Sequence, residues 1–258
     1  MICLNLVFLW ISLILIFLCW GSFLNVVAYR SIYDIPFLAK RSVCPHCRNV
    51  IFWYDNIPVL SWLFLCGKCR HCKKSISFLY PFIEIITALI MTLLLLKVDD
   101  ILSFWVFFLF FSALIVATRT DLQAMVIPQI FSLWLVPFGM VFAYFDLLNI
   151  TFTQSFFGAI LGYASLYFTA KIFKMISKKE GLGVGDMELL GMIGAFLGPI
   201  GVWLSLLVGS FSGLFIAGGY ILLTKKSKET KIPFGPFLAL GATIYFFFNE
   251  YLNTFLLG

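Results

Sequence analysis

The sequence contains few charged residues. Asp, Glu, Lys and Arg make up 12% of its 258 residues, whereas hydrophobic residues make up 62%. Soluble globular chains are about half apolar and a quarter charged, and a water-soluble core of this length could not absorb so much apolar surface. The composition therefore excludes an ordinary soluble protein and predicts an integral membrane protein in contact with the lipid bilayer.

Histidine is also scarce. The two histidines, His46 and His71, each lie between two cysteines of a short motif. The sequence therefore argues against a Ser-His-Asp or Cys-His site in the membrane, and acid–base chemistry there would have to use carboxylates.

The N-terminal apolar run, residues 3–21, lacks the basic segment and the small-x-small cleavage site of a signal peptide. We therefore expect a retained first helix. The net charge of +6 does not indicate nucleic-acid binding, because the basic residues lie between apolar runs rather than in a stripe among aromatics.

The apolar runs predict an all-α bundle of about eight transmembrane helices, since a span needs roughly 20 residues. The runs are 3–28, 79–97, 101–118, 127–147, 152–174, 187–199, 200–223 and 233–257. With eight spans, all of the 18 Lys and Arg residues except Lys97 fall on one side of the membrane. The positive-inside rule places that side in the cytoplasm and both termini outside.

Three regions follow from this topology. Residues 1–29 form the first transmembrane helix, residues 30–78 a cytoplasmic loop domain, and residues 79–258 a core of about seven helices. Glycines at four-residue spacing, such as Gly158 and Gly162, predict close helix packing in lipid.

The loop domain contains two C-x-x-C motifs, which predict a zinc site formed by Cys44, Cys47, Cys69 and Cys72. A segment this short cannot build much of a core, and a structural metal would supply folding free energy. His46 or His71 could replace a thiolate, and Cys66 lies outside the repeat. A redox pair of cysteines is the alternative interpretation.

Two carboxylates stand out, because charged groups near the bilayer interior are costly and usually functional. Asp121 ends the third predicted span and Asp186 opens the sixth. If the two helix ends are neighbours, the carboxylates share a proton, and one activates water while the other polarises a peptide carbonyl. Gly183 and Gly185 would let a peptide approach beside Asp186. Alternatively, Asp186 only caps its helix.

The chain resembles the type IV prepilin peptidase family, whose members are GxGD aspartyl membrane proteases. The matching motifs lie between residues 21 and 241, nearly the whole chain. In order, they are Gly21–Arg30, Cys44–Cys47, Tyr54–Trp62, Cys69–Cys72, Tyr80–Glu84, Asp121 with Pro128, Gly183–Asp186 and Pro233–Gly241.

The resemblance implies a bacterial cytoplasmic-membrane enzyme that uses Asp121 and Asp186 for catalysis. Such enzymes cut the short basic leader from type IV prepilins and type II secretion pseudopilins on the cytoplasmic side. Many members also methylate the new N-terminus with S-adenosylmethionine, an activity associated with the cysteine-containing part. The sequence has no glycine-rich motif for that cofactor, so its binding residues are not predicted, and nor is the oligomeric state.

One departure from the family is Glu188, where a Lys is usual. Glu84 matches the family, and helix packing or methyl transfer are both open as its role. The competing interpretations are a transporter or channel with a carboxylate proton relay, a non-enzymatic pilus assembly factor, and a membrane thiol oxidoreductase.

Overall fold

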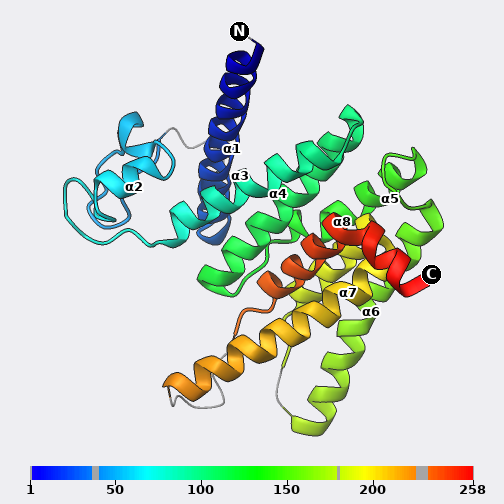
Figure 1. Cartoon of the computed structure of the whole chain (residues 1–258). Coiled ribbons are helices and arrows are strands. Elements are labelled where there is room, and N and C mark those ends of the chain that lie inside the picture. The colour runs from blue at the N-terminus through cyan, green and yellow to red at the C-terminus, as the bar shows by residue number, and fades with distance from the viewer. Residues whose placement is uncertain (1, 37–40, 179–180, 225–231, 258) are drawn as a thin grey trace. The chain divides into compact units, whose positions relative to one another are not determined.

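The computed structural model describes residues 2–36, 41–178, 181–224 and 232–257. These residues form helices joined by turns, and no strand occurs among them beyond two isolated bridges. The predicted all-helical class is therefore confirmed (Figure 1). The α-helices are α1 (Ile2–Ile32), α2 (Leu60–Phe64), α3 (Leu79–Lys97), α4 (Ile101–Ala124), α5 (Val136–Tyr144), α6 (Phe152–Ser177), α7 (Val184–Thr224) and α8 (Gly235–Leu257).

Five of the described helices, α1, α3, α4, α6 and α7, are long and apolar enough to cross a membrane. Each of these helices contains a long apolar stretch with few charged residues, as a lipid-facing segment requires. These helices match predicted spans, and the protein is a multi-pass membrane protein.

The predicted span over residues 127–147 is wrong as a single helix. The structure has two 3-10 turns there, η2 (Gln129–Phe131) and η3 (Leu133–Leu135), before the nine residues of α5. Pro128 and Pro137 lack the N–H that a continuous helix would need. Ser132 leaves the helical region at φ −133° and ψ −85°, which separates the two turns.

The predicted spans over 187–199 and 200–223 are two helices that meet at a kink inside the element α7. The 41 residues of α7 contain a break at Gly198, where φ is 72° and ψ is −175°. Glycine adopts a positive φ at little cost, and Pro199 supplies no N–H to continue the helix. The expected boundary at Gly198 and Pro199 is thus confirmed as a kink between two helices.

The chain folds as two compact units, residues 1–119 and residues 120–258. In the first unit, α1 packs on α3, and buried polar groups join them to α4. The Arg119 guanidinium donates a 2.9 Å hydrogen bond to Asn25 and lies 4.9 Å from the ring centre of Tyr80. Asn25 in turn donates to the Tyr80 carbonyl at 3.0 Å.

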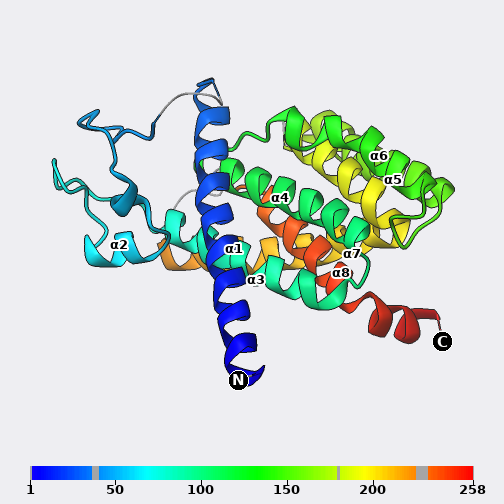
Figure 2. The same cartoon turned by 90° about the horizontal axis from the view of Figure 1, so that it is seen from above.

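In the second unit, α6 and α8 both pack on α7 (Figure 1, Figure 2). The α6–α7 contact is close because glycines face the opposing backbone, and a Cβ at Gly158 or Gly194 would overlap the other residue. The predicted use of these glycines in helix packing is confirmed. Ser155 adds a buried 2.6 Å hydrogen bond from α6 to the Ala195 carbonyl on α7.

Candidate metal cluster and active site

The two C-x-x-C motifs fold into matching knuckles. The N–H of Arg48 donates to the carbonyl of Cys44 at 2.8 Å, and the N–H of Lys73 donates to Cys69 at 3.0 Å. Arg48 and Lys73 both adopt positive φ angles, 57° and 59°. An isolated antiparallel bridge closes each knuckle, Val43 with Val50 and Lys68 with Ser75.

The knuckles bring their four sulfur atoms together. All four lie within 4.8 Å of one another, and the sulfurs of Cys44 and Cys72 are 3.9 Å apart. Sulfur atoms around one tetrahedral zinc ion would be about 3.8 Å apart, given a Zn–S bond of about 2.3 Å. The four predicted ligands could therefore hold one metal ion, and among the described residues neither His46 nor His71 belongs to the cluster.

The thiol groups are electrostatically linked. Hydrogen bonds from the N–H groups of Cys72 and His71 lower the pKa of Cys69 to about 7. The N–H of Asn49 also acts to lower the pKa of Cys47, yet burial and the neighbouring thiols raise it to about 11. Four clustered thiols cannot all lose their protons without a cation to offset the charge, so this chemistry fits a metal site.

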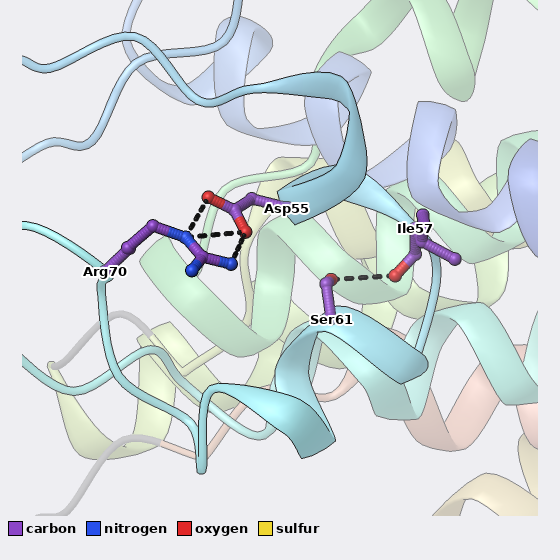
Figure 3. A network of polar contacts seen from close by, with 4 residues as sticks. All are labelled: Asp55, Ile57, Ser61 and Arg70. Atoms are coloured by element: carbon purple, nitrogen blue, oxygen red, sulfur yellow. Dashed lines mark hydrogen bonds and ion pairs between the residues drawn. The ribbon is translucent and has the colours of Figure 1, made fainter.

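A second contact ties the knuckles to the rest of the loop domain (Figure 3). Arg70, inside the second knuckle, binds Asp55 of η1 (Trp53–Asn56) through Nε and Nη2, with the shortest distance 2.6 Å. Its guanidinium also lies 5.4 Å from the ring centre of Tyr54. Ser61, in α2, donates a 2.7 Å hydrogen bond to the Ile57 carbonyl.

Glu84 has a contact that the sequence did not predict. This buried carboxylate on α3 accepts a 2.7 Å hydrogen bond from the N–H of Val59, and Ser22 of α1 also bonds to it. Val59 has a φ of 61° and directly precedes α2, so its N–H has no helical partner. Glu84 therefore anchors the loop domain to the helices from which it emerges.

Asp121 lies in the last turn of α4 and is 5% exposed. Its Oδ2 accepts a 2.9 Å hydrogen bond from the N–H of Gly235, the first residue of α8. A Cβ at Gly235 would lie 2.9 Å from that same oxygen, so only glycine brings the N–H this close without displacing the carboxylate.

Asp186 lies in the first turn of α7, as predicted. The N–H of Gly183 hydrogen-bonds to its carboxyl group, and the charge of Asp121 acts on it. Its Oδ1 is buried and has no hydrogen-bond partner among the described residues. The structure therefore brings the two predicted aspartates within electrostatic range, each with a backbone N–H donated by a glycine.

Ile127 packs between the two glycine-containing segments, a contact that no sequence pattern predicts. A Cβ at Gly185 would lie 2.9 Å from Cβ of Ile127, and one at Gly235 would lie 3.1 Å from its Cδ1. The space beside Gly185 is therefore filled by protein, contrary to the expectation that it admits a peptide substrate. Gly183 is exposed, and a Cβ there would meet Oδ2 of Asp186 at an ordinary contact distance of 3.4 Å.

Two of the contacts that shape the site had partial sequence signals. Gly235 lies in the Pro233–Gly241 motif, which matched the family without indicating a role for its N–H. Glu188 stood out as a departure from the family, and the structure shows both its oxygens bonded, to Gln129 and Ser132. Hydrogen bonds between such distant positions have no local pattern that would predict them.

The chain is similar to known membrane peptidases over most of its length. Residues 15–98 match the bacterial peptidase A24 N-terminal domain, and residues 108–218 match the type IV leader peptidase family. The prepilin leader peptidase/N-methyltransferase of Aeromonas hydrophila is 36% identical over an alignment that covers 96% of each chain. The chain belongs to the type IV leader peptidase family.

Other members of the type IV leader peptidase family show similar agreement. The prepilin leader peptidase/N-methyltransferase of Pseudomonas aeruginosa is 31% identical over 93% of this chain and 90% of its own length. The type 4 prepilin-like proteins leader peptide-processing enzyme of Escherichia coli O78:H11 is 35% identical over 87% of this chain and 89% of its own length. No solved structure matches the chain significantly. The resemblance inferred from the motifs is confirmed, and the protein is a membrane peptidase rather than a transporter.

Proposed function

We propose that this protein is a prepilin peptidase that removes the leader from type IV prepilins or related pseudopilins, using Asp121 and Asp186. One observation carries the proposal. Two carboxyl groups from α4 and α7 lie within electrostatic range of each other in a member of a leader peptidase family. The glycine N–H groups of both neighbouring segments orient them.

The two carboxyl groups share one proton, because two like charges held close do not both ionise easily. The ionised carboxylate takes a proton from water, whose oxygen attacks the scissile carbonyl carbon. The protonated carboxyl donates a hydrogen bond to the carbonyl oxygen, which polarises it. The C–N bond then breaks, and the amine leaves with the proton that the first carboxylate had accepted.

The charge pattern supports the side of the membrane on which cleavage occurs. In the predicted eight-span topology, all basic residues except Lys97 lie on one side of the membrane. The positive-inside rule places that side in the bacterial cytoplasm. The cysteine loop and both aspartates belong to that face in this topology. A basic leader that is still in the cytoplasm would then meet the aspartates while its apolar segment lies in lipid.

We propose that Cys44, Cys47, Cys69 and Cys72 hold a structural zinc ion. The separation of 3.9 Å between the sulfurs of Cys44 and Cys72 fits tetrahedral coordination, and a set of four thiolates favours zinc. The ion would supply folding free energy to a loop that has little core of its own. We assign it no part in peptide cleavage.

We also propose N-methylation of the new N-terminus with S-adenosylmethionine, since the relatives are named N-methyltransferases. A hollow of about 380 Å³ lies against the first knuckle and is lined by Arg41, Ser42, Ile51, Phe52, Trp53 and Asn56. Aromatic faces suit a purine and a sulfonium cation, and a guanidinium suits a carboxylate. The 2.9 Å bond from Ile51 N–H to the Ser42 carbonyl holds two parts of this wall together.

The hollow can be tested by direct binding. Trp53→Ala should weaken binding of S-adenosylmethionine to the purified protein, measured by isothermal titration calorimetry. Phe64→Ala is the matched control, since Phe64 is an exposed aromatic of the same loop that does not line the hollow. Equal binding by both variants would contradict this location for the cofactor.

The proposed cleavage is tested by incubating the detergent-purified protein with a prepilin and measuring intact masses. We expect loss of the leader, followed by a gain of one methylene when S-adenosylmethionine is present. A prepilin that stays intact with wild-type protein would contradict the proposal. Cleavage without any later mass gain would contradict the methylation alone.

A further inference from the structure

Glu188 is a buried carboxylate that the proposed cleavage does not use. It is 4% exposed and lies on α7, two residues after Asp186. At 3.6 residues per turn, these two positions are about 200° apart around the helix. Glu188 therefore points away from Asp186 and needs an explanation of its own, because a buried charge is costly unless it is hydrogen-bonded.

Both oxygens of Glu188 are used by one neighbouring segment. Gln129 donates from Nε2 to Oε1 at 2.8 Å, and Ser132 donates from Oγ to Oε2 at 3.2 Å. Gln129 lies in η2 and the fully buried Ser132 follows it directly. One side chain of α7 thus holds the turn that follows the helix of Asp121.

That turn is connected directly to the catalytic site. The chain leaves α4 at Met125, where φ is 54°, and passes Ile127 to reach Gln129. Ile127 fits against Gly185 on one side and Gly235 on the other, with almost no spare space. A shift of this turn would therefore move the two segments that place the Asp186 and Asp121 carboxyl groups.

We infer that Glu188 is a positioning residue, which binds the turn at residues 127–132 to α7 and so fixes the separation of Asp121 and Asp186. The inference rests on the proposed function, because it concerns the geometry needed for cleavage. Glu188 touches neither aspartate and transfers no proton. Its effect on the rate comes from holding the two carboxyl groups where one proton can serve both.

The direction of the hydrogen bonds allows an exchange experiment. Gln129→Glu would set two carboxylates against each other and break the Nε2–Oε1 bond. Adding Glu188→Gln would restore the bond in the opposite direction, since the new amide donates to the new carboxylate. Ser132 would keep an acceptor in the amide oxygen at position 188, so the exchanged pair retains both contacts.

We expect Gln129→Glu to lower kcat for prepilin cleavage by about 10- to 100-fold, as small misplacements of catalytic groups do. The exchanged pair should return kcat to within about threefold of wild type. KM should change little in all variants, because a positioning role involves no contact between these side chains and the leader. Glu188→Gln alone keeps one acceptor oxygen, so its kcat should lie between that of Gln129→Glu and that of the exchanged pair.

Ser155→Ala provides the control for a structural effect. It removes another buried hydrogen bond to α7, at Ala195, away from the carboxylates. We expect it to lower the melting temperature and leave kcat unchanged.

The inference is overturned if folded Gln129→Glu and Glu188→Gln variants lose stability but keep wild-type kcat, or if the exchanged pair folds without recovering kcat. If the wild-type protein cleaves prepilin and these variants keep its kcat, only this inference is overturned. Wild-type protein that cleaves no prepilin would overturn the proposed function, and the inference with it.

Discussion

The four cysteines reach one cluster through two short knuckles, whereas the two aspartates are carried by α4 and α7, which are distant in the sequence. In the knuckles, each turn is fixed by hydrogen bonds within a few residues, such as Arg48 to Cys44. At the aspartates, the geometry depends on Gly235 and Ile127, which come from other segments.

The two regions should therefore respond differently to substitutions. In the proposed zinc site the knuckles depend on a bound ion, so they should fail together when one ligand is lost. The aspartate site depends on packing between helices, so it should lose activity gradually as neighbours are altered. The two regions should also fail separately, since each has its own set of contacts.

The largest expected effect is the loss of cleavage in Asp186→Asn, by about 10³-fold or more. The amide cannot take a proton from water, whereas its size is unchanged. The measurement is leader release by intact mass, together with zinc content, which should match wild type. Asp146→Asn is the control, because it makes the same change at an exposed loop residue of the same unit. Equal loss in both would contradict the assignment.

Cys69→Ser should remove the zinc ion, from about one per chain to nearly none, because three thiolates no longer complete the tetrahedral site. Metal analysis of the purified protein checks this, and methylation should be lost with the ion. Leader cleavage should persist within about tenfold, since Asp121 and Asp186 lie in the other unit.

The control for Cys69→Ser is Cys66→Ser, at an exposed cysteine outside the cluster. It should keep its zinc. Cleavage that disappears in Cys69→Ser but not in Cys66→Ser would show that the two regions do not fail separately.

A smaller effect is expected from Gly235→Ala. The added Cβ would lie 2.9 Å from Oδ2 of Asp121, so the carboxylate must shift by a few tenths of an ångström. We expect kcat to fall by about tenfold while the protein keeps its zinc. Gly213→Ala, where a Cβ would meet its nearest neighbour on α8 at an ordinary 3.4 Å, should leave kcat unchanged. A similar kcat for both variants would contradict the crowding argument.

The smallest effect concerns the ion pair of Arg70 and Asp55. Arg70 is half exposed and its ion pair is screened by solvent, so Arg70→Leu should destabilise the cysteine loop only slightly, and less still in high salt. Arg70 holds the pKa of Asp55 below its usual range, so the pair is intact above about pH 4 and is lost only as the pH falls through that lowered pKa. Thermal unfolding at pH 7 and pH 5.5 should therefore show the same difference from wild type.

Much of this molecule follows from local patterns. Apolar runs predicted α1, α3, α4, α6 and α8 because a membrane span has a fixed minimum length. The cysteine spacing predicted the metal cluster because its ligands are close in sequence.

The sequence could not predict the turns at residues 129–135. Their apolar residues are typical of a span, but Pro128 and the hydrogen bond of Ser132 to Glu188 favour turns over a continuous helix. The packing of Ile127 between two glycines was equally hidden, since it depends on three segments that meet only after folding. Asp121 and Asp186 were predicted as a pair from their places at helix ends and from the family resemblance, and not from any contact.

The central claim is that Asp121 and Asp186 act as one catalytic unit. The most direct measurement is kcat/KM for leader cleavage in Asp121→Asn, Asp186→Asn and the double variant, each checked for zinc content and helicity. Groups that act together are not additive, so all three variants should fall to the same low rate. A double variant whose loss equals the product of the two single losses, or a single variant with wild-type activity, would contradict the account.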